Sequence, residues 1–113
     1  MAYELIVKVK GQEKTFTRNE PPMVENLLDA LKVQRIDTER FADGSKPPSD
    51  KLQKDWLDAL LQFAVNFWGD GLTKKDLQTG LPSKDIEVIS QAVIETLGYG
   101  DNSDDEEEVN PKG

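Results

Sequence analysis

The region that most constrains the fold is residues 59–100, ALLQFAVNFWGDGLTKKDLQTGLPSKDIEVISQAVIETLGYG. It is the part of the chain richest in aromatic and branched apolar side chains, so a hydrophobic core must form around it. Gly69, Gly80 and Gly98 interrupt the apolar pattern, and glycine is typical of helix ends because it adopts the left-handed conformation at little cost. The order of these signals predicts a long helix, a short capped helix and a final amphipathic helix.

The helix that leads into Gly69 has the widest apolar surface in the chain. Ser49 is placed to cap its start, and apolar side chains then recur every three or four residues. This surface is wider than a helix packed on one side needs, so we predict a central helix that is covered on several sides or lies at an oligomer contact. The apolar positions are Leu52, Trp56, Leu60, Phe63 and Phe67, flanked by Leu57, Leu61, Ala64 and Trp68.

The N-terminal residues predict a β-hairpin. Tyr3–Val9 and Glu13–Arg18 are rich in β-branched residues and alternate in polarity, and Gly11–Gln12 supplies a turn between them. An isolated hairpin is only marginally stable in water, so one of its faces must pack on the rest of the chain.

The hairpin is followed by a predicted helix and a predicted loop. A helix is expected from about Met23 to Gln34, and residues 35–48 are expected to form a loop that is either a partner contact or a plain connector. In the helix, the apolar stripe Val24, Leu27, Leu28 and Leu31 lies opposite Glu25, Asn26, Asp29 and Lys32.

Capping signals delimit the last two helices. Thr73–Asp76 is typical of a capping box at the start of a short helix that Gly80 ends. Ser83 is the expected N-cap of the final helix, whose apolar stripe is Ile86, Ile89, Val93 and Leu97 with Val88, Ala92 and Ile94 beside it.

These elements together predict an α+β fold that is mostly α, with an N-terminal β-hairpin followed by about four helices. We expect one domain over residues 1–100, with the hairpin in 1–19 and the helices in 20–100. Residues 101–113 carry six acids and one base, and we expect them to be a disordered acidic tail. The tail either keeps the protein soluble or is an interaction segment that contacts basic partners or blocks premature assembly.

Composition excludes several kinds of chemistry. The chain has no cysteine and no histidine, which removes disulfides, thiolates, the commonest general base and the commonest zinc ligand. A calcium loop aligned on Gly71 would place Trp68 and Leu77 where oxygen ligands are required. We therefore expect neither a metal nor a cofactor, and no enzymatic activity.

Charge and hydropathy bound the location and the partners. The net charge of −8 and the absence of a basic patch argue against nucleic-acid binding. The opening MAYELIVKVKGQEK has neither a signal-peptide pattern nor a membrane span, so we expect a soluble cytoplasmic protein. The aromatic cluster Trp56, Phe63, Phe67 and Trp68 has two interpretations, as hydrophobic core or as a protein-binding anchor.

The segment Leu72–Leu81, LTKKDLQTGL, together with the apolar helix before it and the glycine-closed helix after it, resembles the C-terminal half of a known family. This family is the tail assembly chaperones of long, non-contractile-tailed bacteriophages of Gram-positive hosts. The hairpin MAYELIVKVKGQEKTFT resembles the opening of the same family. The resemblance implies a non-catalytic protein of the host cytoplasm that solubilises the tape measure protein and is absent from the mature virion.

The resemblance also implies recruitment of the major tail protein through a longer, frameshifted form, and self-association is a further expectation. The residues expected to form core or contact are Trp56, Phe63, Phe67, Trp68, Leu72, Leu77 and Leu81. Two alternatives stay open: a structural head–tail connector or tail completion protein of the virion, and a small regulatory or enzyme-inhibiting binding module.

Overall fold

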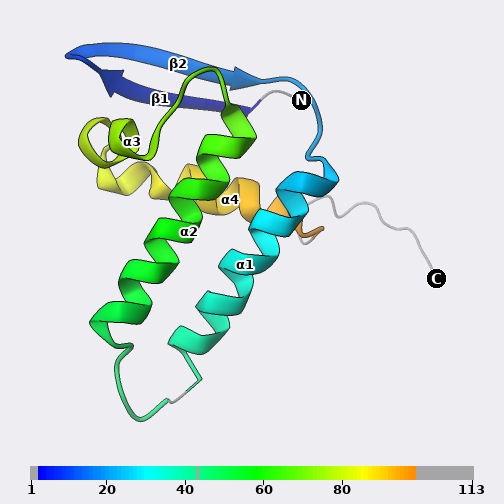
Figure 1. Ribbon diagram of the computed structural model, residues 1–113, viewed down its shortest axis with the longest axis vertical. Helices are drawn as coiled ribbons and strands as arrows, with labels where there is room; N and C mark the ends of the chain where they lie inside the picture. The colour runs from blue at the N-terminus through cyan, green and yellow to red at the C-terminus, as the bar shows by residue number, and fades with distance from the viewer. Residues whose placement is uncertain (1–2, 43, 99–113) are drawn as a thin grey trace.

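The computed structural model describes residues 3–42 and 44–98, and the predicted acidic tail lies outside these residues (Figure 1). Its elements follow the predicted order, a β-hairpin and then four α-helices, which confirms the predicted fold class. They are β1 (Tyr3–Val9), β2 (Gln12–Arg18), α1 (Val24–Arg40), α2 (Asp50–Trp68), α3 (Lys74–Gly80), the 3-10 turn η1 (Ser83–Asp85) and α4 (Ile86–Thr96).

The hairpin buries one face and exposes the other. Leu5 lies opposite Phe16 in the antiparallel register, and these two side chains are buried together with Val7. The turn is Lys10–Gly11, one residue earlier than predicted, and both residues have positive φ, 53° and 82°. Positive φ at both central residues is the backbone of a type I′ turn, which matches the right-handed twist of the two strands.

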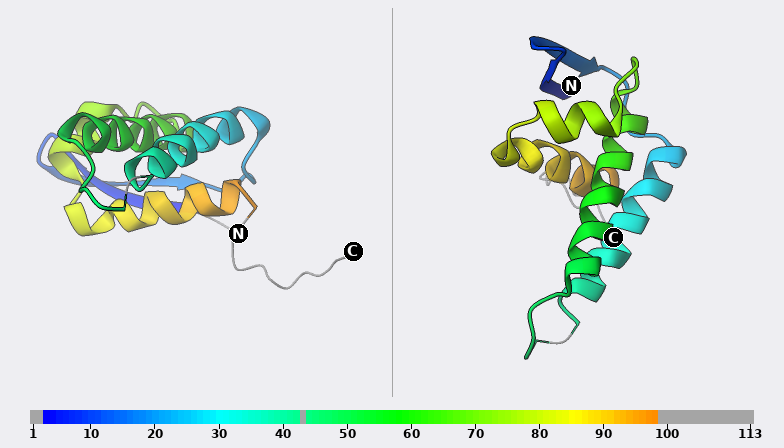
Figure 2. Two further views of the ribbon diagram at one scale, coloured as in Figure 1. Left: turned by 90° about the horizontal axis from the view of Figure 1, so that it is seen from below. Right: turned by 60° about the vertical axis from the view of Figure 1, so that its left-hand side comes forward.

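Helix α2 is central, as predicted. Strand β2 and helices α1, α3 and α4 all contact it. The hairpin lies across one end of α2, α1 runs antiparallel beside it, and α4 crosses both helices, so that the α1–α2 pair projects beyond α4 (Figures 1 and 2). The buried residues of α2 are Ala59, Leu60, Leu61, Phe63, Ala64, Phe67 and Trp68.

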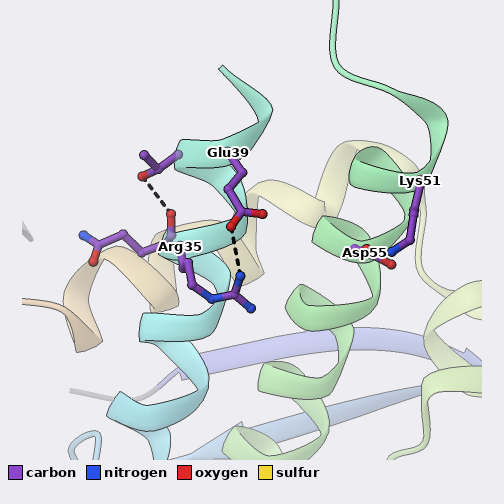
Figure 3. Close-up of polar contacts among 6 residues, drawn as sticks. Arg35, Glu39, Lys51 and Asp55 are labelled. Atoms are coloured by element: carbon purple, nitrogen blue, oxygen red, sulfur yellow. Dashed lines mark hydrogen bonds and ion pairs between the residues drawn. The ribbon is translucent and has the colours of Figure 1, made fainter. Parts of the chain in front are cut away.

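Helix α1 continues to Arg40, so the predicted loop over residues 35–48 was wrong in its first six residues. Ile36 is buried, and Arg35 forms an ion pair with Glu39 one turn later, at 3.0 Å (Figure 3). Such i, i+4 pairs support a helix. The connection to α2 is therefore residues 41–49, and Ser49 caps α2 by accepting a hydrogen bond from the backbone N–H of Leu52.

The buried face of α1 also differs from the predicted stripe. Asn26 is fully buried, whereas Val24, Leu28 and Leu31 are exposed. The Asn26 side-chain oxygen accepts hydrogen bonds from the backbone N–H of Met23, at 2.8 Å, and from the Arg18 guanidinium, at 3.2 Å. The residues of α1 that enter the core are Ala30, Val33 and Ile36.

Arg18 connects the hairpin, α1 and α2. Its guanidinium donates to the backbone carbonyls of Pro21 and Phe67, each at 2.7 Å, and lies 4.4 Å from the centre of the Phe67 ring. The Phe67 carbonyl belongs to the last turn of α2, where backbone oxygens lack helical partners. Arg18 therefore caps α2 and, through Asn26, fixes how the start of α1 faces the core.

The short helix α3 begins and ends where predicted, but Gly80 has a different role from the expected cap. Thr73 and Asp76 form the predicted capping box. A side chain at position 80 would overlap the backbone carbonyl of Lys8 in β1. Glycine is therefore needed here because the end of α3 packs directly on the strand backbone.

The start of the final helix is also corrected. Ser83 is not its N-cap, because Ser83–Asp85 form the 3-10 turn η1 and α4 begins at Ile86. Short 3-10 turns are frequent at helix starts. Ile89, Ala92 and Val93 face the core, and Gly98 follows the helix with a φ of 90°.

Candidate protein-binding surface

Most of the seven candidate residues lie in the core. Phe63, Phe67, Trp68, Leu72 and Leu77 are buried. Trp56 and Leu81 are only partly buried and pack at the margin of the same core. The structure thus favours the core interpretation for five of the seven, and leaves Trp56 and Leu81 accessible. That these residues bind a partner stays a prediction.

The buried aromatic side chains join the hairpin to the end of α2. Phe63 and Phe67 are stacked with ring centres 5.1 Å apart, and Phe67 meets both Tyr3 and Trp68 edge to face at 5.0 and 4.9 Å. The Trp68 indole N–H donates to the backbone carbonyl of Tyr3 at 3.2 Å. A buried indole needs such a partner, so Trp68 is held as a structural residue.

Trp56 lies in an apolar groove of about 260 Å³ where α1, α2 and α4 meet, which we call the Trp56 groove. Most of the residues that line it are apolar, and Gln34, Asp37 and Ser90 add polar groups. The apolar lining residues are Val33, Trp56, Leu60, Val93, Ile94 and Leu97.

Arg40, near the end of α1, contacts Trp56, which lines the groove. Its guanidinium lies 4.0 Å from the centre of the Trp56 ring, forms an ion pair with Asp37 at 3.3 Å and donates to the side chain of Gln53 at 3.1 Å. A cation over an indole face is a favourable contact. The last turn of α1 is therefore joined to Trp56 and Gln53 of α2 through Arg40.

A second apolar groove, of about 210 Å³, lies along a neighbouring face of α2 and is called the Leu57 groove. Its apolar lining comes from Leu57, Leu61, Leu77, Leu81 and Ile86. Successive residues of α2 divide between the two grooves, since Trp56 and Leu60 line the first whereas Leu57 and Leu61 line the second. Helix α4 contributes to both.

Sequence analysis did not single out Leu57, Ile86, Val93, Ile94 and Leu97 as contact residues, although it placed them on apolar stripes. The signal that could have found them is the width of these stripes. A helix that buries one face does not need apolar residues on its flanks, and Leu57 and Ile94 are such flanking residues, 39% and 40% exposed.

A third cleft is lined mostly by polar and charged residues, and we call it the polar cleft. It has a volume of about 480 Å³, lies between the start of β1 and α4, and is bordered by Glu4, Glu87 and Glu95. Burial, and then a hydrogen bond with Glu95, raise the pKa of Tyr3 above its ordinary value. The lining carries four acidic residues and one basic residue, Lys84, so the cleft disfavours anionic ligands.

The described residues contain neither a metal-ligating cluster nor a membrane-spanning helix. Within residues 3–42 and 44–98, no group of three or more His, Cys, Asp or Glu side chains could hold a metal ion. None of the helices described in that part of the chain is long and apolar enough to cross a membrane. The two apolar grooves beside α2 present mostly apolar lining residues to solvent.

A comparison with protein-family models gives a match along the whole chain. A model described as phage tail chaperone protein matches residues 1–113. No curated protein and no solved structure matches the chain.

Proposed function

This chain belongs to the phage tail chaperone protein family and has a role in tail assembly, and from that premise we propose that it binds and solubilises the tape measure protein. The segment it binds is an apolar face of a helix, and the binding site is the Trp56 groove. Binding is reversible and non-catalytic, so the partner is released when the major tail protein assembles around it.

The observation that carries this proposal is an accessible tryptophan in an apolar groove between three helices. Helix-in-groove recognition places apolar side chains spaced by three or four residues into such a groove. Tryptophan is enriched among the residues that dominate protein interfaces. Trp56 is partly exposed and is held in place by Arg40, so little conformational freedom is lost on binding.

The decisive experiment is co-expression of the full chain with the tape measure protein, with the soluble fraction of that partner as the measurement. Ile94→Asp places a charge at the edge of the Trp56 groove. Val88→Asp is the matched control, because Val88 lies on the same helix, is 39% exposed against 40% for Ile94, and lines the polar cleft instead.

We expect the unchanged chain and Val88→Asp to keep the tape measure protein soluble, and Ile94→Asp to lose this effect because a carboxylate must be desolvated in the groove. If the unchanged chain has no effect on solubility, the proposed function fails. If Ile94→Asp and Val88→Asp solubilise the partner equally well, the Trp56 groove is not the binding site.

The Leu57 groove gives a third arm of the same experiment. Leu57 has nearly the same exposure as the other two positions, 39%, but Leu57→Asp alters the groove on the neighbouring face of α2. A loss of solubilisation comparable to that of Ile94→Asp would extend the binding surface around α2 to Leu77 and Leu81. Full retention would confine it to the Trp56 groove.

We further propose that a longer, frameshifted form recruits the major tail protein, and that the chaperone acts in the host cytoplasm and leaves before the virion is complete. Family membership is the support for this part of the proposal. Mass spectrometry of purified virions tests it, and abundant copies of this chain there would favour the alternative of a structural connector or completion protein. Co-purification of the major tail protein with the extended form, and not with residues 1–113, tests recruitment.

A further inference from the structure

The outer face of α1 exposes a row of apolar side chains. Val24, Leu28 and Leu31 are 74%, 66% and 44% exposed. They are spaced by four and three residues, so they line one side of the helix. Met23, 52% exposed, directly precedes this row. We call Val24, Leu28 and Leu31 the outer α1 face.

This face is separate from the apolar grooves. The outer α1 face lies on the side of the helix opposite the buried residues Ala30 and Val33. The part of α1 that borders the Trp56 groove consists of Val33, Gln34 and Asp37. Single exposed apolar side chains are common on protein surfaces, whereas a continuous row of them marks an interaction site.

Two charged residues flank the row on the same side. Glu25 and Lys32 are seven residues apart, so they lie about two turns from each other along one edge of the outer α1 face. Both are exposed. Among the residues that the structure describes, neither takes part in an ion pair, whereas Arg35 and Arg40 on the same helix both do.

We propose that the outer α1 face binds the same face of a second copy of this chain, with the two α1 helices antiparallel. A twofold axis near Leu28 brings the two Leu28 side chains together and packs Val24 of each copy toward Leu31 of the other. The same axis places Glu25 of each copy beside Lys32 of the other, which gives two reciprocal ion pairs.

The charges select the antiparallel direction. In a parallel pair related by a twofold axis, the edge that carries Glu25 and Lys32 would lie on opposite sides of the contact in the two copies, so neither charge would meet its counterpart. Complementary charges across an interface specify its register. The pattern therefore complements itself only when one helix is reversed.

In this dimer both copies keep their apolar grooves free for the proposed function. No residue of the outer α1 face lines the Trp56 groove or the Leu57 groove. A dimer would therefore present two sets of grooves, and two linked sites bind a long partner more tightly than one. The row is short compared with a standard interface, so the dimer is reversible and its population rises with concentration.

Sedimentation equilibrium of the full chain over a wide concentration range tests the inference. We expect a monomer–dimer equilibrium, and we expect Leu28→Asp to raise the dissociation constant by at least about tenfold because it places two carboxylates at the centre of the contact. Val88→Asp, on an exposed apolar position of α4, should leave the constant unchanged. A chain that stays monomeric up to its solubility limit would overturn the proposal.

Charge reversal distinguishes this contact from any other partner on the same face. Glu25→Lys and Lys32→Glu should each weaken the dimer by roughly fivefold, as expected for exposed pairs that become repulsive. The double variant restores opposite charges across the antiparallel pair and should recover the original constant. If the double variant is weaker than either single variant, the antiparallel arrangement is wrong. Circular dichroism of each variant checks that the helices are intact.

Discussion

Helices α1 and α2 lie side by side and are both amphipathic, but they bury different kinds of residue. Helix α2 buries its largest apolar side chains, among them Phe63 and Phe67. Helix α1 buries Val33 and Ile36 in its second half, but its first half buries Asn26 and Ala30 while Leu28 stays in solvent. Apolar content alone therefore predicts the buried face of α2 and fails for α1.

The difference follows from what each helix meets. Helix α2 is contacted by four neighbouring elements that contribute to the core, so most of its wide apolar surface is covered. Helix α1 begins beside Arg18, whose guanidinium is held by the carbonyls of Pro21 and Phe67 and needs a further acceptor. Asn26 supplies that acceptor, and its position fixes the rotation of α1.

The largest expected effect is the difference in stability loss between one truncated side chain in α2 and one in α1. Phe63→Ala should lower the free energy of unfolding by about 3–5 kcal/mol, since Phe63 is fully buried. Leu28→Ala should change it by no more than about 0.5 kcal/mol, as is usual at exposed positions. Urea denaturation at a concentration where the chain is monomeric measures both. Equal losses would mean that α1 is packed through its outer face.

A pair of crossed substitutions tests the polar anchor of α1. Asn26→Leu makes the buried face more apolar, yet it should cost about 1–3 kcal/mol because the Met23 N–H and an Arg18 N–H lose their acceptor. Leu28→Asn makes the outer face more polar and should cost about 0.5 kcal/mol, mainly in helix propensity. The predicted stripe of apolar residues requires the opposite order, so denaturation of the two variants decides between them.

Local signals in the sequence were sufficient to predict the element order. Alternation defined the hairpin, and glycines with Ser49 and Thr73 defined the ends of α2 and α3. Two differences, in the buried face of α1 and in the role of Gly80, arose where a distant contact decides the structure. The burial of Asn26 depends on Arg18 in another element, and Gly80 is required by the backbone of Lys8. Neither contact is visible in a pattern of neighbouring residues.

The candidate site was predictable in part for the same reason. The aromatic spacing of α2 located the core and included Trp56, which borders a groove. The groove itself needs α4 to cross α1 and α2, and the sequence contains no signal for a crossing angle. Ile94 and Leu57 became candidates only when the structure placed them at groove edges.

A smaller loss of stability is expected from a substitution where the end of α1 contacts the start of α2. Arg40→Met keeps an apolar stem but removes the contacts of the guanidinium with Trp56, Asp37 and Gln53. The Arg40 Nε atom is buried without a hydrogen-bond partner, so its removal offsets part of the loss. We expect a decrease of about 1 kcal/mol in the free energy of unfolding. A decrease as large as that of Asn26→Leu would mean that α1 is anchored equally at both ends.

The smallest effect is expected from the exposed ion pairs of the two helices, Arg35–Glu39 in α1 and Lys51–Asp55 in α2 (Figure 3). The hydrogen bond from Lys51 to Asp55 raises the pKa of Lys51, so its contribution to stability is present at neutral pH and is lost only as the pH rises through that raised value. Solvent screens both pairs. We expect Lys51→Ala and Arg35→Ala to leave the melting temperature at neutral pH unchanged within measurement error.

The two ion-pair variants also test whether α1 and α2 differ on their solvent-facing surfaces. The pairs have the same i, i+4 spacing and similar exposure, so they report on the solvent-facing surfaces alone. If the two melting temperatures agree, α1 and α2 differ only in what they bury and in the outer α1 face. If Arg35→Ala lowers the melting temperature clearly more than Lys51→Ala does, the last turns of α1 depend on the Arg35–Glu39 pair for their helical structure. The helix would then extend to Arg40 because of local electrostatics rather than because Ile36 is buried.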